Sequence, residues 1–486
     1  MRIVVERIET AHTPESLAAS LRHDEGLVLL RTQTFGMPSA RYSFVTSRPM
    51  VSFRSFGSKC ETRIDSHTEH QFGNPWPLVA ALLARYELLD QLDVPFPLGG
   101  AFGYFGYDLK QFTEPRLSRQ AIHDLDLPDC HLGFYDSLVV FDHALDQVSI
   151  VATGLSADGT RTETAARTQF ERWRDLLTRL PLDPVLAPVE EPIEPVDYTS
   201  SFSRAGFIAA VSRAQRYIWA GDIYQVNLAQ RLDLPWVKDG WAFYERISAM
   251  SPAPFSAFLA GDDFSVVSSS PELFLRLSGN HMLTRPIKGT RPRSPDPIRD
   301  AQLTYELQRS EKEMAELVMI TDLLRNDLGR VCEFGSVQVP ELVRLERYRH
   351  VQHLVSTVEG RLRAGLTHLD ALAACFPGGS ITGAPKIRAM QIIDELEPIE
   401  RGPYTGCLGY FGFNRESQFS ITIRTAVVKD RRAWYHAGAG IVADSVPEAE
   451  YEETLAKARG FLLAGHARMD EISTIKTHER QIADGQ

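Results

Sequence analysis

The segment GDIYQVNLA (residues 221–229) shows how the C-terminal half of this chain is built. Before it, residues 203–219 repeat apolar side chains at the spacing of one helix face, and the Gly-Asp pair ends that helix. Tyr224, Val226 and Leu228 then alternate with other side chains at the period of a strand. We therefore expect a helix followed directly by a strand.

The same two periods continue toward the C-terminus. We expect further strands at 264–270, 272–277, 281–288, 405–413 and 419–428. We expect helices at 297–328, 366–376, 384–396 and 447–463. Residues 1–180 instead alternate short apolar runs with turn residues, which predicts short strands, with one helical stretch at 160–180.

A proline-rich acidic stretch divides the chain. Residues 181–197 hold five prolines and five acidic residues, and proline at that density continues neither a helix nor a central strand. We therefore place an N-terminal region at 1–180, a linker at 181–200, a C-terminal region at 201–465 and a polar, fraying tail at 466–486.

Length, composition and charge limit the class of protein. The 486 residues are 43% hydrophobic and 24% charged, as in ordinary globular proteins. Fifty-two basic and 63 acidic residues leave a net charge of −11, which argues against a general nucleic-acid binder. No stretch approaches the roughly 18 apolar residues of a membrane span, and charges interrupt the apolar N-terminus, so we expect neither a membrane segment nor a signal peptide. Five scattered cysteines without a CxxC pair indicate reduced thiols in a cytoplasmic protein.

Two expected helices each carry a pair of glutamates three residues apart. Glu313 and Glu316 share one helix face, and Glu450 and Glu453 share another, which Lys457 continues. One carboxylate from each helix would suit Mg²⁺, which takes oxygen ligands from protein and substrate. Each pair taken alone is better explained as a solvated helix face, since surface carboxylates are common.

Lys288 lies in a rigid basic segment, RPIKGTRPR (residues 285–293). Proline and glycine restrict the backbone there, and we expect a turn. The three arginines favour a neutral, nucleophilic lysine by like-charge repulsion. The segment taken alone nevertheless favours the alternative, an exposed lysine in a basic turn.

Two small-residue segments are candidate anion sites. GGSITGAPK (378–386) runs into an expected helix whose N-terminus would offer backbone N–H groups, and Gly438-Ala439-Gly440 could form a second cradle. Neither has the Walker A spacing, so nucleotide binding is not supported. His353 lies in a strand-like run and is a candidate pocket histidine, not part of a zinc pair. Cys407 lacks the glycine pattern of a glutaminase elbow and is interpreted as structural.

Together these segments resemble the chorismate-utilising enzymes, with a dense match over most of residues 200–465. The matching segments are GDIYQVNL (221–228), SPEL (270–273), the Lys288 segment, TDLLRNDL (321–328), SITGAPK (380–386), ITIR (421–424) and AGAGIVADS (437–445). The resemblance implies an α+β fold: a large two-layered α/β body of mainly antiparallel sheets wrapped by helices, with the active site in the central cleft. It also implies that the regions on either side of the linker are intertwined.

Two positions distinguish members within this family. Members that add water to chorismate carry a lysine where this chain has Gln225, and glutamine has no basic nitrogen to activate water. Members that make anthranilate typically read PIAGT where this chain reads PIKGT (286–290), whereas members that aminate chorismate at C4 typically carry the lysine. The resemblance therefore implies 4-amino-4-deoxychorismate as the product, with anthranilate synthesis as the alternative.

The resemblance also implies roles for individual residues. Lys288 attacks C2 of chorismate while Glu272 protonates the leaving C4 hydroxyl, and ammonia then displaces the lysine. Magnesium is held by Glu316 and Glu453, with Glu313 and Glu450 behind them. The substrate is bound by Gln225, Thr382, His353, Tyr404, Arg424, Gly438, Gly440 and Lys457. A binder without catalytic activity would not need the proton donor.

The expected partners follow from the same resemblance. The chain has no glutaminase motif, so a separate glutamine amidotransferase subunit would supply ammonia. Some relatives bind tryptophan between an LLES segment and a second wall, which match Leu29–Thr32 (LLRT) and Ser251–Phe255 here. Tryptophan is therefore a candidate ligand of the N-terminal region, with Arg31 in the place of the glutamate.

Overall fold

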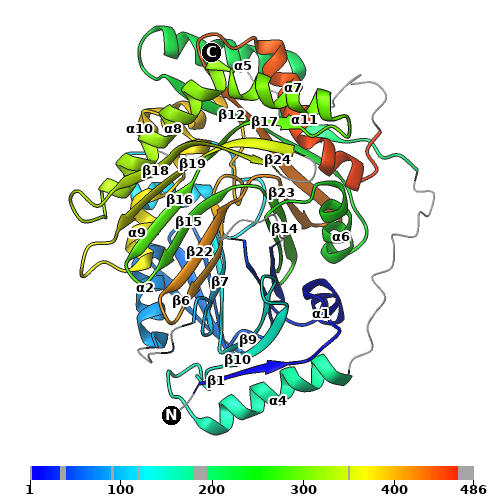
Figure 1. Ribbon diagram of the computed structural model, residues 1–486, viewed down its shortest axis with the longest axis vertical. Helices are drawn as coiled ribbons and strands as arrows, with labels where there is room; N and C mark the ends of the chain where they lie inside the picture. Colours follow the sequence, from blue (N-terminus) through cyan, green and yellow to red (C-terminus); the bar gives the residue numbers. More distant parts are fainter. Residues whose placement is uncertain are drawn as a thin grey trace, which may run out of the picture.

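Two large sheets form the body of the protein in the computed structural model, and their strands pair in antiparallel fashion (Figure 1). The structure describes residues 3–32, 40–88, 92, 94–117, 120–179, 194–347 and 351–468. Most of the predicted linker and tail, at 181–193 and 469–486, lies outside the described residues. Within the described ranges, no helix is long and apolar enough to cross a membrane.

The first sheet combines strands from both ends of the sequence. Its order is β1 (Val4–Ile8), β10 (Gln147–Ala152), β9 (Ser137–Asp142), β3 (Tyr42–Thr46), β2 (Val28–Arg31), β13 (Phe255–Ala260), β14 (Phe264–Ser270), β23 (Thr425–Lys429), β24 (Arg432–Ile441), β12 (Gln225–Pro235) and β11 (Thr199–Ser200). The short β20 (Gly383–Ala384) also pairs with β12.

The second sheet likewise combines strands from the N-terminal and C-terminal regions of the sequence. Its order is β17 (Ile287–Pro292), β19 (Val351–Arg361), β16 (His281–Arg285), β15 (Leu273–Ser278), β22 (Glu416–Ile421), β21 (Cys407–Gly412), β7 (Gly100–Phe105), β8 (Cys130–Tyr135), β4 (Val51–Phe56), β5 (Lys59–Ile64) and β6 (His67–Phe72), with β18 (Gln338–Arg347) on β19.

The regions on either side of the linker share both sheets. In the first sheet β2 pairs with β13, and in the second sheet β7 pairs with β21. Residues 1–180 and 201–465 are therefore regions of the sequence that complete each other's sheets. The described start of the predicted tail is also held in place, because Val196 N donates to His466 O at 2.9 Å and Arg468 N donates to Val196 O at 2.9 Å.

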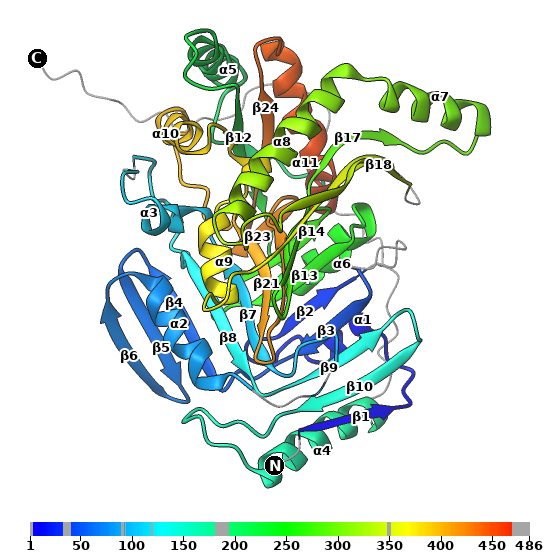
Figure 2. The same cartoon turned by 60° about the vertical axis from the view of Figure 1, so that its left-hand side comes forward.

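Helices cover the first sheet on the face turned away from the second sheet (Figures 1 and 2). They are α1 (Pro14–Ser20), α4 (Glu163–Arg179), α5 (Arg204–Trp219), α6 (Gly240–Met250), α10 (Lys386–Leu396) and α11 (Pro447–Ala464). The remaining α-helices are α2 (Pro75–Tyr86), α3 (Lys110–Thr113), α7 (Pro297–Gln308), α8 (Glu311–Gly329) and α9 (His368–Cys375). Among these, α7 and α8 pack on β17, the strand that carries Lys288.

Three predicted elements are wrong in their extent. The helix expected at 297–328 is two helices, because α7 ends at Gln308 and Ser310 caps the start of α8 by accepting a hydrogen bond from Glu313 N. The strand expected at 281–288 is interrupted at Pro286, between β16 and β17. The strand expected at 419–428 is divided between β22 and β23, which belong to different sheets.

The largest hydrophobic core lies between the sheets and draws on both sequence regions. Phe44 of the first sheet contacts Tyr410 of the second edge to face, with ring centroids 5.2 Å apart. Five buried free cysteines, as expected, lie within this body (Cys60, Cys130, Cys332, Cys375 and Cys407). Because both regions contribute side chains to one core, neither buries its apolar surface alone.

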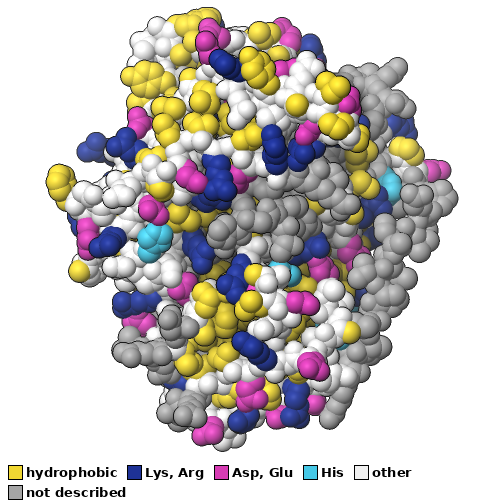
Figure 3. Space-filling model, in the orientation of Figure 1, with side chains coloured by type: hydrophobic (Ala, Val, Ile, Leu, Met, Phe, Trp, Pro, Cys, Tyr) yellow, Lys and Arg dark blue, Asp and Glu magenta, His cyan; other side chains and the backbone are white. Residues whose placement is uncertain are grey.

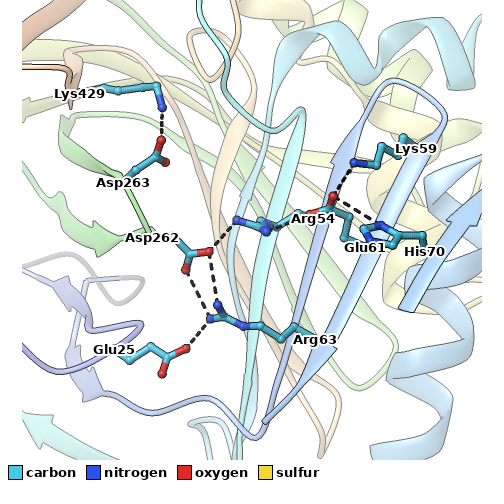
Figure 4. A network of polar contacts seen from close by, with 9 residues as sticks. All are labelled: Glu25, Arg54, Lys59, Glu61, Arg63, His70, Asp262, Asp263 and Lys429. Atoms are coloured by element: carbon cyan, nitrogen blue, oxygen red, sulfur yellow. Dashed lines mark hydrogen bonds and ion pairs between the residues drawn. The ribbon is translucent and has the colours of Figure 1, made fainter. Parts of the chain in front are cut away.

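An ionic network also ties the two sheets together (Figure 4). Arg54 of β4 pairs with Asp262 in the β13–β14 turn at 2.7 Å and with Glu61 at 2.9 Å. Arg63 of β5 pairs with the same Asp262 at 3.4 Å and with Glu25. On the face of the molecule shown in Figure 3, basic and acidic side chains are interspersed over the described residues.

Candidate active site

One strand and one helix bring the predicted nucleophile close to a predicted metal ligand. Lys288 lies on β17, and α8 packs against that strand. Lys288 Nζ is 3.8 Å from Glu316 Oε2, and the two side chains are 19% and 15% exposed. An amine and a carboxylate therefore share a largely buried site.

Lys288 is on strand β17, so the turn expected for the basic segment is wrong, while the strand expected to end at this residue is correct there. The pairing of β17 with β19 shifts register between Lys288 and Thr290. Gly289 between them has φ +66°, and a Cβ there would come within 2.8 Å of Leu307 Cδ1. This is the geometry of a glycine β-bulge, which redirects the neighbouring side chain.

The expected effect of the three arginines on Lys288 is not supported by their placement. Arg285 pairs with Glu346, Arg293 with Asp300 at 2.8 Å, and Arg291 with Glu313 at 3.4 Å. Each guanidinium charge is therefore compensated by its own carboxylate.

Glu272 lies in the short connection between β14 and β15 and is buried, with 6% exposure. Its backbone carbonyl accepts from Ile421 N at 3.1 Å, and Ser270 Oγ donates to Ile421 O at 2.6 Å. These bonds fasten the connection to β22. The position of the carboxyl is thus set by two neighbouring strands.

The environment of Glu272 favours its protonated form. Burial raises the pKa of Glu272 to about 7, while a hydrogen bond with Ser380 and the charge of Lys288 act in the opposite direction. Near neutral pH, a substantial fraction of Glu272 therefore carries a proton that it can donate. Ser380 belongs to the small-residue loop, so one function of that loop is to contact Glu272.

The carboxylates of α8 and α11 interact with one another. Burial raises the pKa of Glu316, and the charges of Glu313 and Glu453 add to this rise. Burial opposes ionisation of Glu453, yet Lys457, at 2.6 Å, holds the pKa of Glu453 below its usual value. Burial also raises the pKa of Glu450, against a hydrogen bond from Ser445 at 2.7 Å.

This arrangement fits a divalent cation held by few protein ligands. Among the described residues, no three His, Cys, Asp or Glu side chains form a group that could hold a metal ion. Mg²⁺ commonly takes one or two carboxylates and completes its shell with water and substrate oxygens. Glu316 and Glu453, coupled by charge across two helices, suit that arrangement. The magnesium site, with Glu316 and Glu453 as ligands and Glu313 and Glu450 behind them, stays a prediction.

Across the site, β24 and β12 present small and uncharged groups. Gly438 and Gly440 pair with Ala229 and Asn227, so the expected loop cradle is a strand. Among the described strands β23 pairs with β24 only as far as Tyr435, which leaves one edge of 436–441 outside the ladder. Alternate backbone N–H groups of that edge can therefore bind an anion.

Side chains pack closely against these two glycines. A Cβ on Gly438 would lie 2.8 Å from the Tyr404 hydroxyl, and a Cβ on Gly440 would lie 2.8 Å from Gln225 Nε2. Gln225 is 1% exposed, and its Oε1 has no hydrogen-bond partner among the described residues. Burial raises the pKa of Tyr404, which keeps its hydroxyl protonated.

We call Glu272, Lys288 and Glu316 the titratable wall of the site. We call Gln225, Tyr404, Gly438 and Gly440 the glycine wall.

The remaining predicted residues lie next to these walls. Lys457 Nζ donates to Gly438 O at 2.9 Å. His353 bonds Thr290 Oγ1 through Nδ1 at 2.8 Å, and burial, with the charge of Arg424, lowers the pKa of His353 to about 4, so the ring is neutral. Thr382 is fully buried, and its hydroxyl donates to Gly378 O at 3.1 Å, within its own loop.

The match to known proteins follows this geometry. The family described as "chorismate binding enzyme" matches residues 41–463, which includes both walls. The chain belongs to the chorismate-binding enzymes. Its α+β fold of two antiparallel sheets is confirmed by solved structures. One is anthranilate synthase component I from Streptococcus pneumoniae, with a TM-score of 0.76 and 31% identity over 89% of this chain and 94% of that chain.

Curated relatives carry two different names. "Anthranilate synthase component 1" of Acetivibrio thermocellus is 37% identical over 95% of this chain and 94% of that protein. "Aminodeoxychorismate synthase component 1" of Bacillus subtilis is 37% identical over 91% of this chain and 92% of that protein. The two names share chorismate chemistry, and equal identity does not choose between them.

A large cavity of this chorismate-binding enzyme lies between the N-terminal region and residues 248–252. It has a volume of about 1180 Å³ and is lined by Arg31, Thr32 and Pro252 among other residues. The two segments expected to form a tryptophan pocket thus meet at one cavity. Arg31 forms an ion pair with Glu15 there. Tryptophan binding stays a prediction.

Sequence reasoning did not assign a role to Lys312 or Ser380. Lys312 follows Ser310 in the first turn of α8, and its charge lowers the pKa values of Glu316, Glu450 and Glu453. Only its spacing of four from Glu316 could have indicated this role. Ser380 had no such signal, because its contact with Glu272 crosses more than one hundred residues of sequence.

Proposed function

We propose that this chorismate-binding enzyme is an aminodeoxychorismate synthase component I, which aminates chorismate at C4. The observation that carries the proposal is an amine, Lys288, that lies 3.8 Å from the carboxylate of Glu316 and within electrostatic range of the buried acid Glu272. A nucleophile and a proton donor in one site suit a substitution in which one group attacks as another leaves.

The reaction is balanced in two steps. Neutral Lys288 forms a bond to C2 while the C4–O bond breaks and Glu272 gives its proton to the departing hydroxyl, which leaves as water. Ammonia then bonds to C4, the C2–N bond breaks, and Lys288 leaves as a neutral amine. The new ammonium group loses one proton to the Glu272 carboxylate, which restores the acid. Two successive displacements place nitrogen at C4 with retention.

The glycine wall would bind the substrate. The phenol of Tyr404, the charges of Arg424 and Lys457 and the open backbone edge at Gly438–Gly440 suit carboxylate groups. Mg²⁺ bound by Glu316 and Glu453 would supply positive charge next to a substrate carboxylate. Gln225 offers no base for water, which favours amination over hydration.

Ammonia has to come from a second protein. The sequence lacks a glutaminase motif, and the relatives are named as first components. We therefore propose a glutamine amidotransferase subunit as partner. The isolated chain is expected to use ammonium and not glutamine.

Anthranilate synthase component I is the second candidate, because the curated relative from Acetivibrio thermocellus and the solved structure from Streptococcus pneumoniae both carry that name. Incubating the pure chain with chorismate, Mg²⁺ and ammonium chloride, followed by chromatography of the product, distinguishes the two. We expect 4-amino-4-deoxychorismate. Anthranilate as the sole product would favour the second candidate over the proposal. No turnover with either ammonium or glutamine would contradict both candidates.

A further inference from the structure

Tyr404 of the glycine wall also lines a small, separate cavity. The cavity lies among β12, β23 and β24 and two loops at residues 123–129 and 400–404. It leaves about 30 Å³ for the centres of water-sized molecules. Since one such molecule needs roughly 10–15 Å³ by this measure, the cavity holds about two molecules of that size.

Two buried polar atoms that line this cavity have no hydrogen-bond partner among the described residues. They are Nε1 of Trp434 and Nε2 of His436. The two residues are separated by one position on β24, so they lie on the same face of the sheet. Both groups need a partner inside the cavity, because an unsatisfied buried polar group is costly.

One of these atoms is a donor and the other an acceptor. The indole Nε1–H of Trp434 can only donate. A ring nitrogen of His436 is hydrogen-bonded to the Glu400 backbone, and this nitrogen is Nδ1 because Nε2 is the unpartnered one. Burial, with the charges of Arg231 and Arg401, lowers the pKa of His436 well below its usual value. The ring is therefore neutral, and Nε2 presents a lone pair.

A ligand that satisfies both atoms must be small, neutral and able both to accept and to donate. Water and ammonia meet these conditions. An ammonium ion has no lone pair for the Trp434 N–H, and a simple anion has no hydrogen for His436 Nε2. The small volume excludes larger amines.

The cavity lies between the glycine wall and the outside of the protein. Tyr404 stacks on His436 with ring centroids 5.0 Å apart and an angle of 10°, so one aromatic ring separates the cavity from Gly438. At the other end, Asp124 pairs with Arg231 and His123 pairs with Glu400 at 2.7 Å. The side chains of His123 and Asp124 are 47% and 35% exposed.

We propose that this cavity is a binding site for neutral ammonia, held between Trp434 and His436 on its way to the substrate. The inference rests on the ammonia-using chemistry of the proposed function. It holds for either candidate product, because both contain nitrogen from ammonia.

Filling the cavity tests the site. The probe is ammonium chloride, added to the pure full-length chain at saturating chorismate and Mg²⁺, with turnover followed as loss of chorismate. Val427 lines the cavity and lies opposite Trp434 in the pairing of β23 with β24. We expect Val427→Phe to raise the KM for ammonium about tenfold, equivalent to losing roughly 1.4 kcal/mol of binding, while the KM for chorismate changes less than about twofold. The matched control Val427→Ala, which enlarges the cavity, is expected to keep both constants near their normal values.

A second variant guards against misfolding of the first. Trp434→Phe removes only the donor and is expected to raise the KM for ammonium about fivefold, the effect of one lost hydrogen bond. An unchanged KM for ammonium in folded Val427→Phe, or in Trp434→Phe if the first variant does not fold, overturns the proposal and leaves a water-filled cavity. Parallel increases of both KM values also overturn it, because they indicate general damage. These measurements follow the loss of chorismate and do not depend on which product forms. A failure of the proposed function would therefore be detected separately, by the product assay.

Discussion

The two walls of the site differ in chemistry although both are built from antiparallel strands. The titratable wall places an amine within electrostatic influence of both a buried acid and a second carboxylate. The glycine wall has backbone groups, an amide and a protonated phenol, packed so closely that a single added Cβ meets a neighbour at 2.8 Å. We infer that the titratable wall carries out proton transfer and bond formation, and that the glycine wall determines which substrate binds.

The largest expected effect is on the titratable wall at Lys288. Lys288→Ala is expected to reduce 4-amino-4-deoxychorismate formation by about 10³-fold or more, because the covalent nucleophile is lost. Lys288→Arg is the matched control and should not rescue activity, since a guanidinium remains protonated. Mass spectrometry of the unmodified protein with chorismate and no ammonia should show an adduct on the peptide containing residue 288. A normal rate and product from Lys288→Ala would refute the covalent role and favour the anthranilate alternative.

Glu272 should give the next largest effect and a pH signature. With its pKa near 7, the proton-donating form is lost as pH rises through 7, so adduct formation should fall on that side. Glu272→Gln is isosteric but cannot donate a proton in this way, and is expected to slow adduct formation by about 10²–10⁴-fold. The rate of adduct formation without ammonia, measured from pH 5.5 to about 9, is the readout. If the rate of adduct formation still falls with rising pH in Glu272→Gln, a group other than Glu272 causes that fall.

Glu453 tests whether the titratable wall extends to a metal. Glu453→Gln should raise the Mg²⁺ concentration needed for half-maximal turnover by about 10–100-fold, because it removes one of two proposed ligands. Titration calorimetry with Mg²⁺ and the substrate should show the same loss, with thermal unfolding as the control for the fold. Unchanged magnesium dependence in a folded variant would remove Glu453 from the metal site.

The glycine wall should respond in substrate affinity. Gly438→Ala places a Cβ against the Tyr404 hydroxyl and, at 3.0 Å, the Leu228 carbonyl, whereas in Gly440→Ala the contact is the movable end of Gln225. We expect Gly438→Ala to raise the KM for chorismate about tenfold and to destabilise the fold by about 1–3 kcal/mol, with a smaller effect for Gly440→Ala. Steady-state kinetics and denaturant unfolding measure both. Equal effects of the two changes would mean that the wall does not recognise substrate by close packing.

Local periodicity identified most elements of the C-terminal region. The helix expected from 203–219 is α5, the strand at 264–270 is β14, and the helix at 447–463 is α11 within one residue at its C-terminal end. These succeed because each element buries one face, which imposes its period on the sequence. The failures at Ser310 and near Ile423 are short breaks, where a single cap or turn interrupts an otherwise continuous apolar spacing.

The glutamate spacing correctly indicated shared helix faces, but not what those faces meet. Glu316 and Glu453 influence each other because α8 and α11 come together at the site. The basic segment around Lys288 shows the opposite case. Its arginines are close to the lysine in sequence, yet each pairs with a carboxylate of its own, Glu346, Glu313 or Asp300, that lies elsewhere in the chain.

The sequence by itself determined the chemical groups available to this protein: a lysine in a constrained segment, paired glutamates at helical spacing, and glycines where a backbone can approach a ligand. These groups can be identified from the sequence, because the helix and strand periods that place them depend on local backbone geometry. Only the tertiary structure decided that Ser380 meets Glu272, that β2 pairs with β13, and that Trp434 and His436 line one cavity with Tyr404. These contacts join segments far apart in the chain, and they form because two incomplete regions bury their apolar surface in one shared core.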